Sequence, residues 1–157
     1  MTARMLGWLL LLVPALLLGT VGITSADDIS NHKIVGGVEI YFGVLPAQVI
    51  GEYSAGHVER EMHGGVPSGA HRDHIVVALF DVATGERIGD ARVEATVREI
   101  GLSGKTKTLE PMEIAETITF GNYFDLPNEN LYRIVIRIRR PEASRTIKAE
   151  FLHGHYK

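Results

Sequence analysis

Alternation of apolar and polar residues is the feature that most constrains the fold of this chain. Between Leu131 and Arg140, every second residue is apolar or aromatic, and most of the residues between them are arginine. A helix returns to the same face after about 3.6 positions, whereas a strand does so after two. The pattern therefore predicts a strand with one face in the core and the other in water. Its inward face consists of Tyr132, Ile134, Ile136 and Ile138.

The same period of two recurs from Lys33 onward. Residues 38–44 and 91–98 alternate in this way, while residues 74–81 are apolar on both faces, as is typical of a central strand. Segments rich in Gly, Pro and Asn separate these runs, and no stretch after the N-terminal leader has a helical stripe. We therefore predict an all-β protein, an immunoglobulin-like two-sheet antiparallel sandwich of about seven to eight strands.

One tyrosine supports the immunoglobulin-like form of this prediction. Tyr132 stands at the entry of the best-defined strand, directly after the turn-forming residues 125–130. A tyrosine corner has this position, and its hydroxyl bonds back to the upstream backbone. The alternative is an ordinary core tyrosine.

The N-terminus has the pattern of a secretory signal peptide. Arg4 precedes an apolar run from Met5 to Ile23, and small residues lead to Ala26. We predict a signal peptide over residues 1–26, cleaved after Ala26, and one domain over residues 27–157. An uncleaved anchor is the alternative, because the run approaches the ~20 residues that cross a bilayer; the domain would then contact the membrane. In both cases it lies outside the cytoplasm, and a periplasmic location is expected.

Composition and missing motifs exclude several function classes. With 16 Lys and Arg against 19 Asp and Glu, the formal charge is −3, which argues against nucleic acid as a partner. The chain has no Cys. It also lacks the serine-hydrolase elbow, the zinc-protease motif and the phosphate-binding loop. We therefore predict that it is not an enzyme.

Histidines are concentrated in a segment whose composition predicts a loop. Four of the seven His lie between His57 and His74, where Gly is frequent. Long loops in compact domains often carry function, so His63 and His71 are candidate metal ligands beside His74. The alternative for the loop residues is a solvated segment without a ligand.

The C-terminus and one methionine complete the candidates. Continuing the period of two from Phe151 places His153 and His155 on the core face of the last strand, so that two imidazoles leave the domain together. Met112 offers a thioether, and a soft sulfur ligand combined with imidazole favours copper. Taken singly, the two His are equally explained by a fraying terminus and Met112 by core packing.

Short segments between about His71 and His155 resemble a known group of proteins. They are the strand His74–Asp81, the turn Thr84-Gly85, Asp90–Val93, Leu109–Met112, Phe120-Gly121 and the Tyr132 strand that ends at Arg140-Pro141. These segments resemble exported immunoglobulin-like metal proteins, namely the periplasmic iron-transport accessory family and the YtkA-like domains.

The resemblance implies a copper site. In the iron-transport family, copper is held by a His that opens an early strand, a Met in a Met-Pro-Met segment, a His in a His-Tyr-Gly segment and a further His. His74 and Met112 match the first two positions. At the third position Thr119 stands where the family has His. We expect His153 or His155, or a loop residue such as His63 or His71, to complete the set, and Glu110 to orient a ligand.

Two functional hypotheses follow. The first is an exported, non-catalytic metal-binding protein that handles copper or assists metal transport, with an envelope transporter or a metal-receiving protein as a possible partner. The second is a structural or protein-interaction module of the cell envelope that needs no metal.

Overall fold

The computed structural model describes residues 30–52, 60, 64–69, 71–114 and 116–156. The predicted signal peptide and the loop residue His63 lie outside the described residues. The described chain forms eight strands and one short helix. They are β1 (His32–Val35), β2 (Val38–Pro46), α1 (Ala47–Gly51), β3 (Arg72–Asp81), β4 (Arg92–Glu99), β5 (Lys105–Ile114), β6 (Thr117–Asp125), β7 (Asn130–Arg139) and β8 (Ile147–His155).

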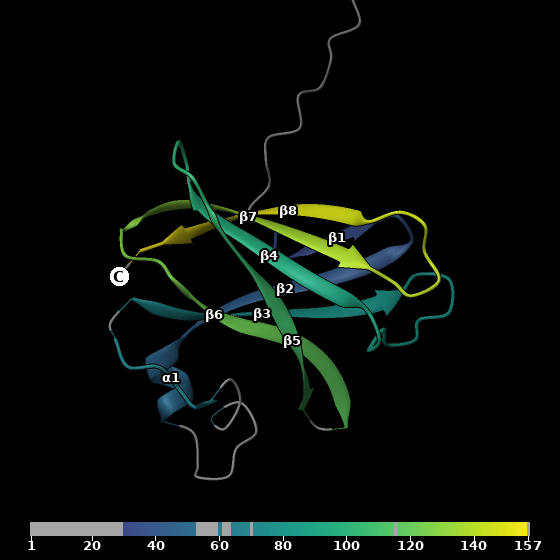
Figure 1. Cartoon of the computed structure of the whole chain (residues 1–157), viewed down its shortest axis with the longest axis horizontal. Coiled ribbons are helices and arrows are strands. Elements are labelled where there is room, and N and C mark those ends of the chain that lie inside the picture. The colour runs from purple at the N-terminus through teal and green to yellow at the C-terminus, as the bar shows by residue number, and fades with distance from the viewer. Residues whose placement is uncertain (1–29, 53–59, 61–63, 70, 115, 157) are drawn as a thin grey trace, which may run out of the picture.

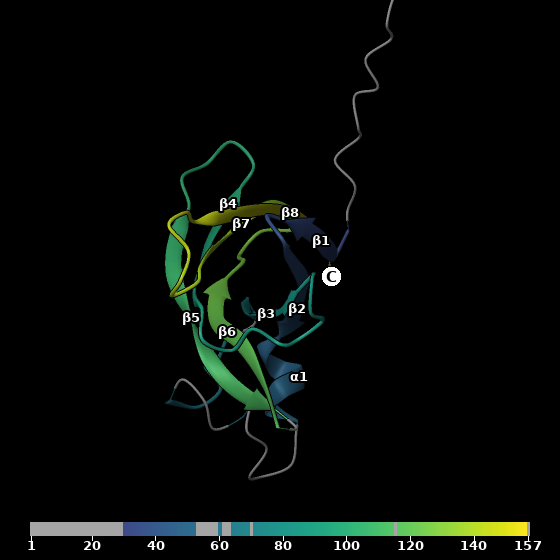
Figure 2. The same ribbon diagram turned by 90° about the vertical axis from the view of Figure 1, so that its right-hand side faces the viewer.

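All strand pairs are antiparallel, in the order β1-β2-β3-β6-β5-β4-β7-β8 (Figure 1). The strand β5 changes partner along its length, because residues 105–109 pair with β4 and residues 110–114 pair with β6. The sheet therefore bends at β5 and curls into an almost barrel-shaped body (Figure 2). Its two edges, β1 and β8, lie side by side, and Lys33 Nζ of β1 stands 5.6 Å from the centre of the Phe151 ring of β8.

The predicted all-β antiparallel class is confirmed. The segments expected at residues 38–44, 74–81, 91–98 and 131–140 are the strands β2, β3, β4 and β7. Their inward side chains form one apolar core inside the curled sheet. On β7, the four residues predicted to face inward are 0–3% exposed.

Tyr132 has the back-bonding geometry that the sequence predicts. Its hydroxyl donates a hydrogen bond to the carbonyl oxygen of Asn128 and accepts one from the Asn128 N–H, both at 3.1 Å. The Asn128 side chain in turn donates to Glu99 at the end of β4. This buried tyrosine therefore fixes the turn between β6 and β7.

The helix α1 is an element that the sequence pattern did not predict. It begins directly after Pro46 and has five residues, which is too short to show an apolar stripe. Ala47 and Ile50 of α1 pack on Tyr123 of β6 in a second apolar cluster, separate from the main core. Within the described residues, no helix is long and apolar enough to span a bilayer.

We predict that Tyr132→Phe lowers the free energy of unfolding by about 1–2 kcal/mol, because both backbone groups of Asn128 lose their partner. Urea unfolding measures the change. The matched control is Tyr41→Phe, since the Tyr41 hydroxyl donates to the side chain of Glu39 on the surface and, among the described residues, to no backbone group. Equal effects of the two substitutions would contradict this role of Tyr132.

Candidate metal centre

His74 is a completely buried imidazole on the outer face of β3. Ile75, Val77 and Leu79 point into the main core, so the alternation of the strand turns His74 to the opposite face. There its ring stacks on Tyr123, with ring centres 4.6 Å apart and an angle of 28° between the planes. Since Tyr123 packs against α1, the imidazole lies beneath the helix.

The strand β6 brings His74 and Met112 to the same place, because β6 pairs with both β3 and β5. Thr119, Gly121 and Tyr123 are alternate residues of β6 and share one face. His74 lies opposite Tyr123 on one side, and Met112 lies opposite Thr119 on the other. Gly121 stands between these two positions.

The two side chains converge over Gly121. A Cβ atom at Gly121 would stand 2.7 Å from His74 Nε2 and 3.0 Å from Met112 Sδ. Both distances are shorter than ordinary van der Waals contact, so the imidazole nitrogen and the thioether sulfur occupy the space that a side chain would fill. An imidazole and a thioether on a common point suit a soft ion such as Cu(I).

Met112 is buried outside the two apolar clusters, which argues against a simple core-filling role. Its side chain is 1% exposed, although its neighbours Pro111 and Glu113 are exposed. Among the residues that the structure describes, Met112 belongs to neither of the two apolar clusters. Its sulfur instead lies beside an imidazole.

Thr119 occupies the position where the resembling family has a His. Its Oγ1 accepts a hydrogen bond of 2.7 Å from Arg87 Nη2, and Arg87 Nε donates to the carbonyl oxygen of Ile118. The guanidinium also lies over the ring of Phe80, 4.7 Å from its centre. Arg87 therefore holds the Thr119 hydroxyl at the edge of the candidate site.

Two further candidates lie close to this pair in the sequence. Glu110 pairs with Gly121 across β5 and β6, so it shares the face of Met112, and it is exposed. His71 is exposed just before β3, and its carbonyl oxygen accepts a hydrogen bond from the Leu126 N–H. His63 lies outside the described residues.

His153 and His155 lie together, as predicted, but in a different cluster. Their ring centres are 6.2 Å apart, and His155 Nδ1 is 3.9 Å from Asp73 Oδ2. Asp73 and His74 are adjacent on β3 and point to opposite faces. The two C-terminal imidazoles therefore line a separate cavity of about 450 Å³ with Asp73 instead of joining His74 and Met112. Within the described chain, no three His, Cys, Asp or Glu side chains are placed to hold a metal ion.

The surroundings of His153 in this second cluster favour its neutral form. Burial lowers the pKa of His153, and the nearby His155 lowers it further. Nε2 of His155 is buried and makes no hydrogen bond within the described part of the chain. Neutral imidazole is the form that binds metals, so His153 keeps the ability to ligate at lower pH than a solvated histidine does.

Sequence reasoning missed three residues that shape these clusters, namely Gly121, Tyr123 and Asp73. Two of them carry a signal in the sequence, since a carboxylate at the start of an apolar strand is unusual, and Gly121 belongs to the Phe120-Gly121 segment of the resemblance. The role of Gly121 depends on the pairing of β6 with two strands, which a single sequence does not reveal.

Comparison with known proteins shows that the fold occurs in copper-bound proteins. No family model matches the chain, and no curated protein matches it in sequence. A copper-bound glutamate-to-glutamine variant of FetP from uropathogenic Escherichia coli is 11% identical, with a TM-score of 0.59 over 81% of this chain and 95% of FetP. A copper-bound methionine-to-isoleucine variant of P19 from Campylobacter jejuni is 13% identical, with a TM-score of 0.59 over 80% of this chain and 94% of P19.

A third solved structure, a DUF4426 family protein from Pseudomonas aeruginosa, is 12% identical, with a TM-score of 0.54 over 82% of this chain and all of that protein. At these identities the likeness shows a shared fold. The resemblance to exported metal proteins that the sequence indicates is thereby confirmed at the level of the fold.

We predict that Gly121→Ala destabilises the protein by about 1–3 kcal/mol, as an overpacked interior does. The added Cβ would meet Met112 Cε at 2.6 Å and His74 Nε2 at 2.7 Å. The thioether can swing aside, but the buried and stacked imidazole cannot. Urea unfolding of the metal-free protein measures the loss.

Gly51→Ala is the matched control for this substitution, because a Cβ at Gly51 meets no atom within 4 Å. We expect it to leave stability unchanged or to raise it slightly. A Gly121→Ala protein as stable as the wild type would show that the two side chains do not crowd Gly121.

We also predict that the metal-free protein loses stability as the pH falls below about 6.5, in part through His153. Because the pKa of His153 is lower in the folded state, the unfolded chain binds more protons in this range, and acid favours unfolding. His153→Gln should reduce this loss, and His32→Gln is the control. Urea unfolding at roughly pH 7.5 and 5.5 measures the free energy of unfolding at each pH. If the loss of stability between the two pH values were the same in His153→Gln as in the wild type, His153 would not contribute to it.

Proposed function

We propose that this protein is an exported, non-catalytic metal-binding protein of the periplasm that handles copper or assists metal transport. The observation that carries the proposal is the convergence of His74 Nε2 and Met112 Sδ on Gly121. Copper-bound proteins with the same fold support it, and a FetP structure comes from protein recombinantly expressed in the periplasm of Escherichia coli.

The chemistry of the two donors supports copper, and Cu(I) in particular. Imidazole serves either oxidation state of copper, whereas a neutral thioether favours the softer Cu(I). Both donors are neutral and do not offset the charge of a buried ion. The free energy of burying a singly charged ion here is therefore less unfavourable than that of burying a doubly charged one. Because His74 is buried and stacked on Tyr123, it is held in place before the ion arrives, which reduces the entropy lost on binding.

Two donors do not complete a coordination shell. Glu110 is exposed two residues before Met112 on β5, His71 is exposed three residues before His74, and His63 falls in the sequence between α1 and β3. We propose that further donors come from this side of the sheet, with Glu110 orienting a ligand. In the same proposal, the second imidazole pair, His153 and His155, binds an ion on its own at the other face of β3.

The alternative is an interaction module of the cell envelope without metal. Partner binding through a sheet edge requires an accessible edge, and in this structure the two edge strands β1 and β8 lie side by side, which leaves less room for an added strand. The immunoglobulin-like description and the signal peptide over residues 1–26 remain part of our proposal. So does an envelope transporter or metal-receiving protein as partner. Capture of a partner from envelope extracts, with and without a chelator, distinguishes the two functions. Only the metal-binding function predicts that the chelator abolishes capture.

We predict that Met112→Leu weakens Cu(I) binding by about tenfold or more, because the only sulfur donor of the pair is lost while the side-chain volume is kept. Zn(II) should be affected less, since zinc in proteins takes nitrogen, oxygen and thiolate donors. His74→Gln should weaken both ions. Competition titrations against a chelator of known affinity measure these constants.

His32→Gln is the control, because His32 lies on β1 and bonds Glu39 at 2.9 Å. Urea unfolding of each metal-free variant verifies that the fold is intact. Wild-type affinity for Cu(I) in a folded His74→Gln/Met112→Leu double variant would eliminate this site.

A further inference from the structure

The outer face of β4, β7 and β8 is strongly basic in a chain whose formal charge is −3. Val93, Ala95 and Val97 of β4 point into the core, so the residues between them face outward. The end of this face that lies away from α1 carries four cations and one carboxylate. These residues are Arg92, Glu94, Arg137, Arg139 and Lys148.

At this end of the face two pairs of like charges stand directly opposite each other, and a third pair, Arg98 with Arg133, lies toward the other end. Arg92 pairs with Arg139 across β4 and β7, and Arg137 pairs with Lys148 across β7 and β8. Like charges in such cross-strand positions destabilise a sheet. Positions that break a local rule in this way are where function is expected, because stability alone would favour other residues.

The protein compensates only part of this charge. Glu94 accepts from Arg92 Nη2 at 3.0 Å, while Arg137 Nη1 donates to the neutral hydroxyl of Thr96 at 2.9 Å. The guanidinium of Arg139 makes no hydrogen bond or ion pair within the described part of the chain. Toward the other end of the face, Arg133 does have a carboxylate partner, Glu150, at 2.5 Å.

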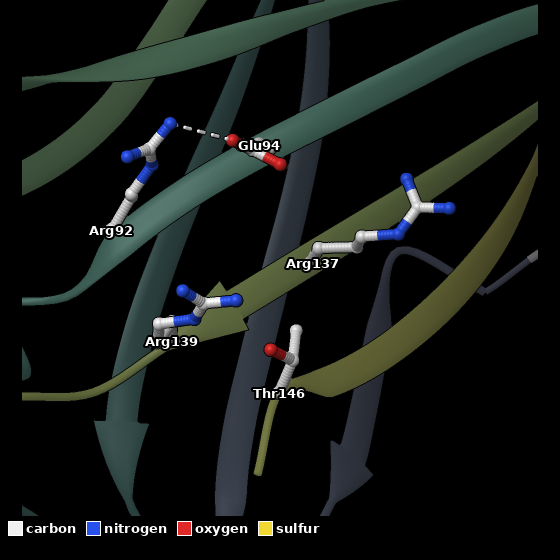
Figure 3. A pocket seen from close by; sticks show the side chains of 5 residues that line it. All are labelled: Arg92, Glu94, Arg137, Arg139 and Thr146. Carbon is white, nitrogen blue, oxygen red and sulfur yellow. Dashed lines mark hydrogen bonds and ion pairs between the residues drawn. The ribbon is translucent and has the colours of Figure 1, made fainter. Parts of the chain in front are cut away.

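A shallow cleft of about 210 Å³ lies among these arginines. Figure 3 shows Arg92, Arg137, Arg139 and Thr146 around it, with Glu94 bonded to Arg92. Guanidinium groups keep their charge at all working pH values and present paired N–H donors that match the oxygens of phosphates and carboxylates. The hydroxyl of Thr146 adds a neutral donor at the rim.

We propose that this cleft binds a small multivalent oxyanion, that is, a phosphate or a polycarboxylate. Such an anion would lie between Arg92 and Arg139 and relieve the repulsion that their pairing creates. The lining holds no apolar side chain to insert into a bilayer, which favours a small soluble anion over a lipid surface. The cleft lies on β4 and β7, away from His74 and Met112, so the proposal does not depend on copper.

The test is a thermal-shift titration of the metal-free protein with sodium phosphate and with citrate, against sodium chloride of equal ionic strength. We expect both oxyanions to raise the unfolding temperature saturably, and chloride to raise it less. Arg139→Gln should weaken the apparent affinity for phosphate about fivefold, in the range of exposed charge pairs. Without oxyanion, the same variant should unfold at the wild-type temperature or above it, because a repulsion has been removed.

Arg133→Gln is the matched control, since it removes an arginine from the same face of β7 whose charge Glu150 already balances. It should keep the wild-type response to phosphate. Equal phosphate responses in the wild type and in Arg139→Gln would overturn the proposal, as would a response no larger than that to chloride. Sedimentation with phosphatidylglycerol vesicles, combined with no response to free phosphate or citrate, would overturn it in favour of a lipid surface.

Discussion

The candidate centre depends on one constraint, which is that β6 is hydrogen-bonded to β3 on one side and to β5 on the other. This pairing fixes His74 and Met112 at diagonal positions around Gly121, although they are far apart in the sequence. A residue with any side chain at position 121 would occupy the space where the two donors meet. The bend of the sheet at β5 is therefore part of the site as well as part of the fold.

The alternation of β3 has a second consequence. Because neighbouring residues of a strand point to opposite faces, Asp73 turns toward the mouth of the curled sheet and His74 turns outward beneath α1. The imidazoles that the sequence suggested as partners of His74 instead gather around Asp73. The molecule thus carries two separate imidazole-bearing clusters on the two faces of one strand, with different chemistry. One offers sulfur, and the other offers a carboxylate beside two nitrogens.

Sequence reasoning was most successful where a local pattern decides the structure. The period of two located β2, β3, β4 and β7, and the turn before Tyr132 predicted the back-bond to Asn128. It also placed His153 and His155 on one face. Sequence reasoning did not detect α1, because a helix of five residues is too short to show an apolar stripe with a period of 3.6 residues. Nor could it place His155 beside Asp73, because that contact depends on how a sheet of eight strands curls and closes.

The account rests on the claim that an imidazole nitrogen and a thioether sulfur share one ion over Gly121. X-ray absorption of the Cu(I)-loaded protein tests this directly, because sulfur and nitrogen neighbours scatter differently. The account predicts a sulfur shell together with a nitrogen shell in the wild type, and loss of the sulfur shell in Met112→Leu. A shell of nitrogen and oxygen alone, identical in the two proteins, would contradict it.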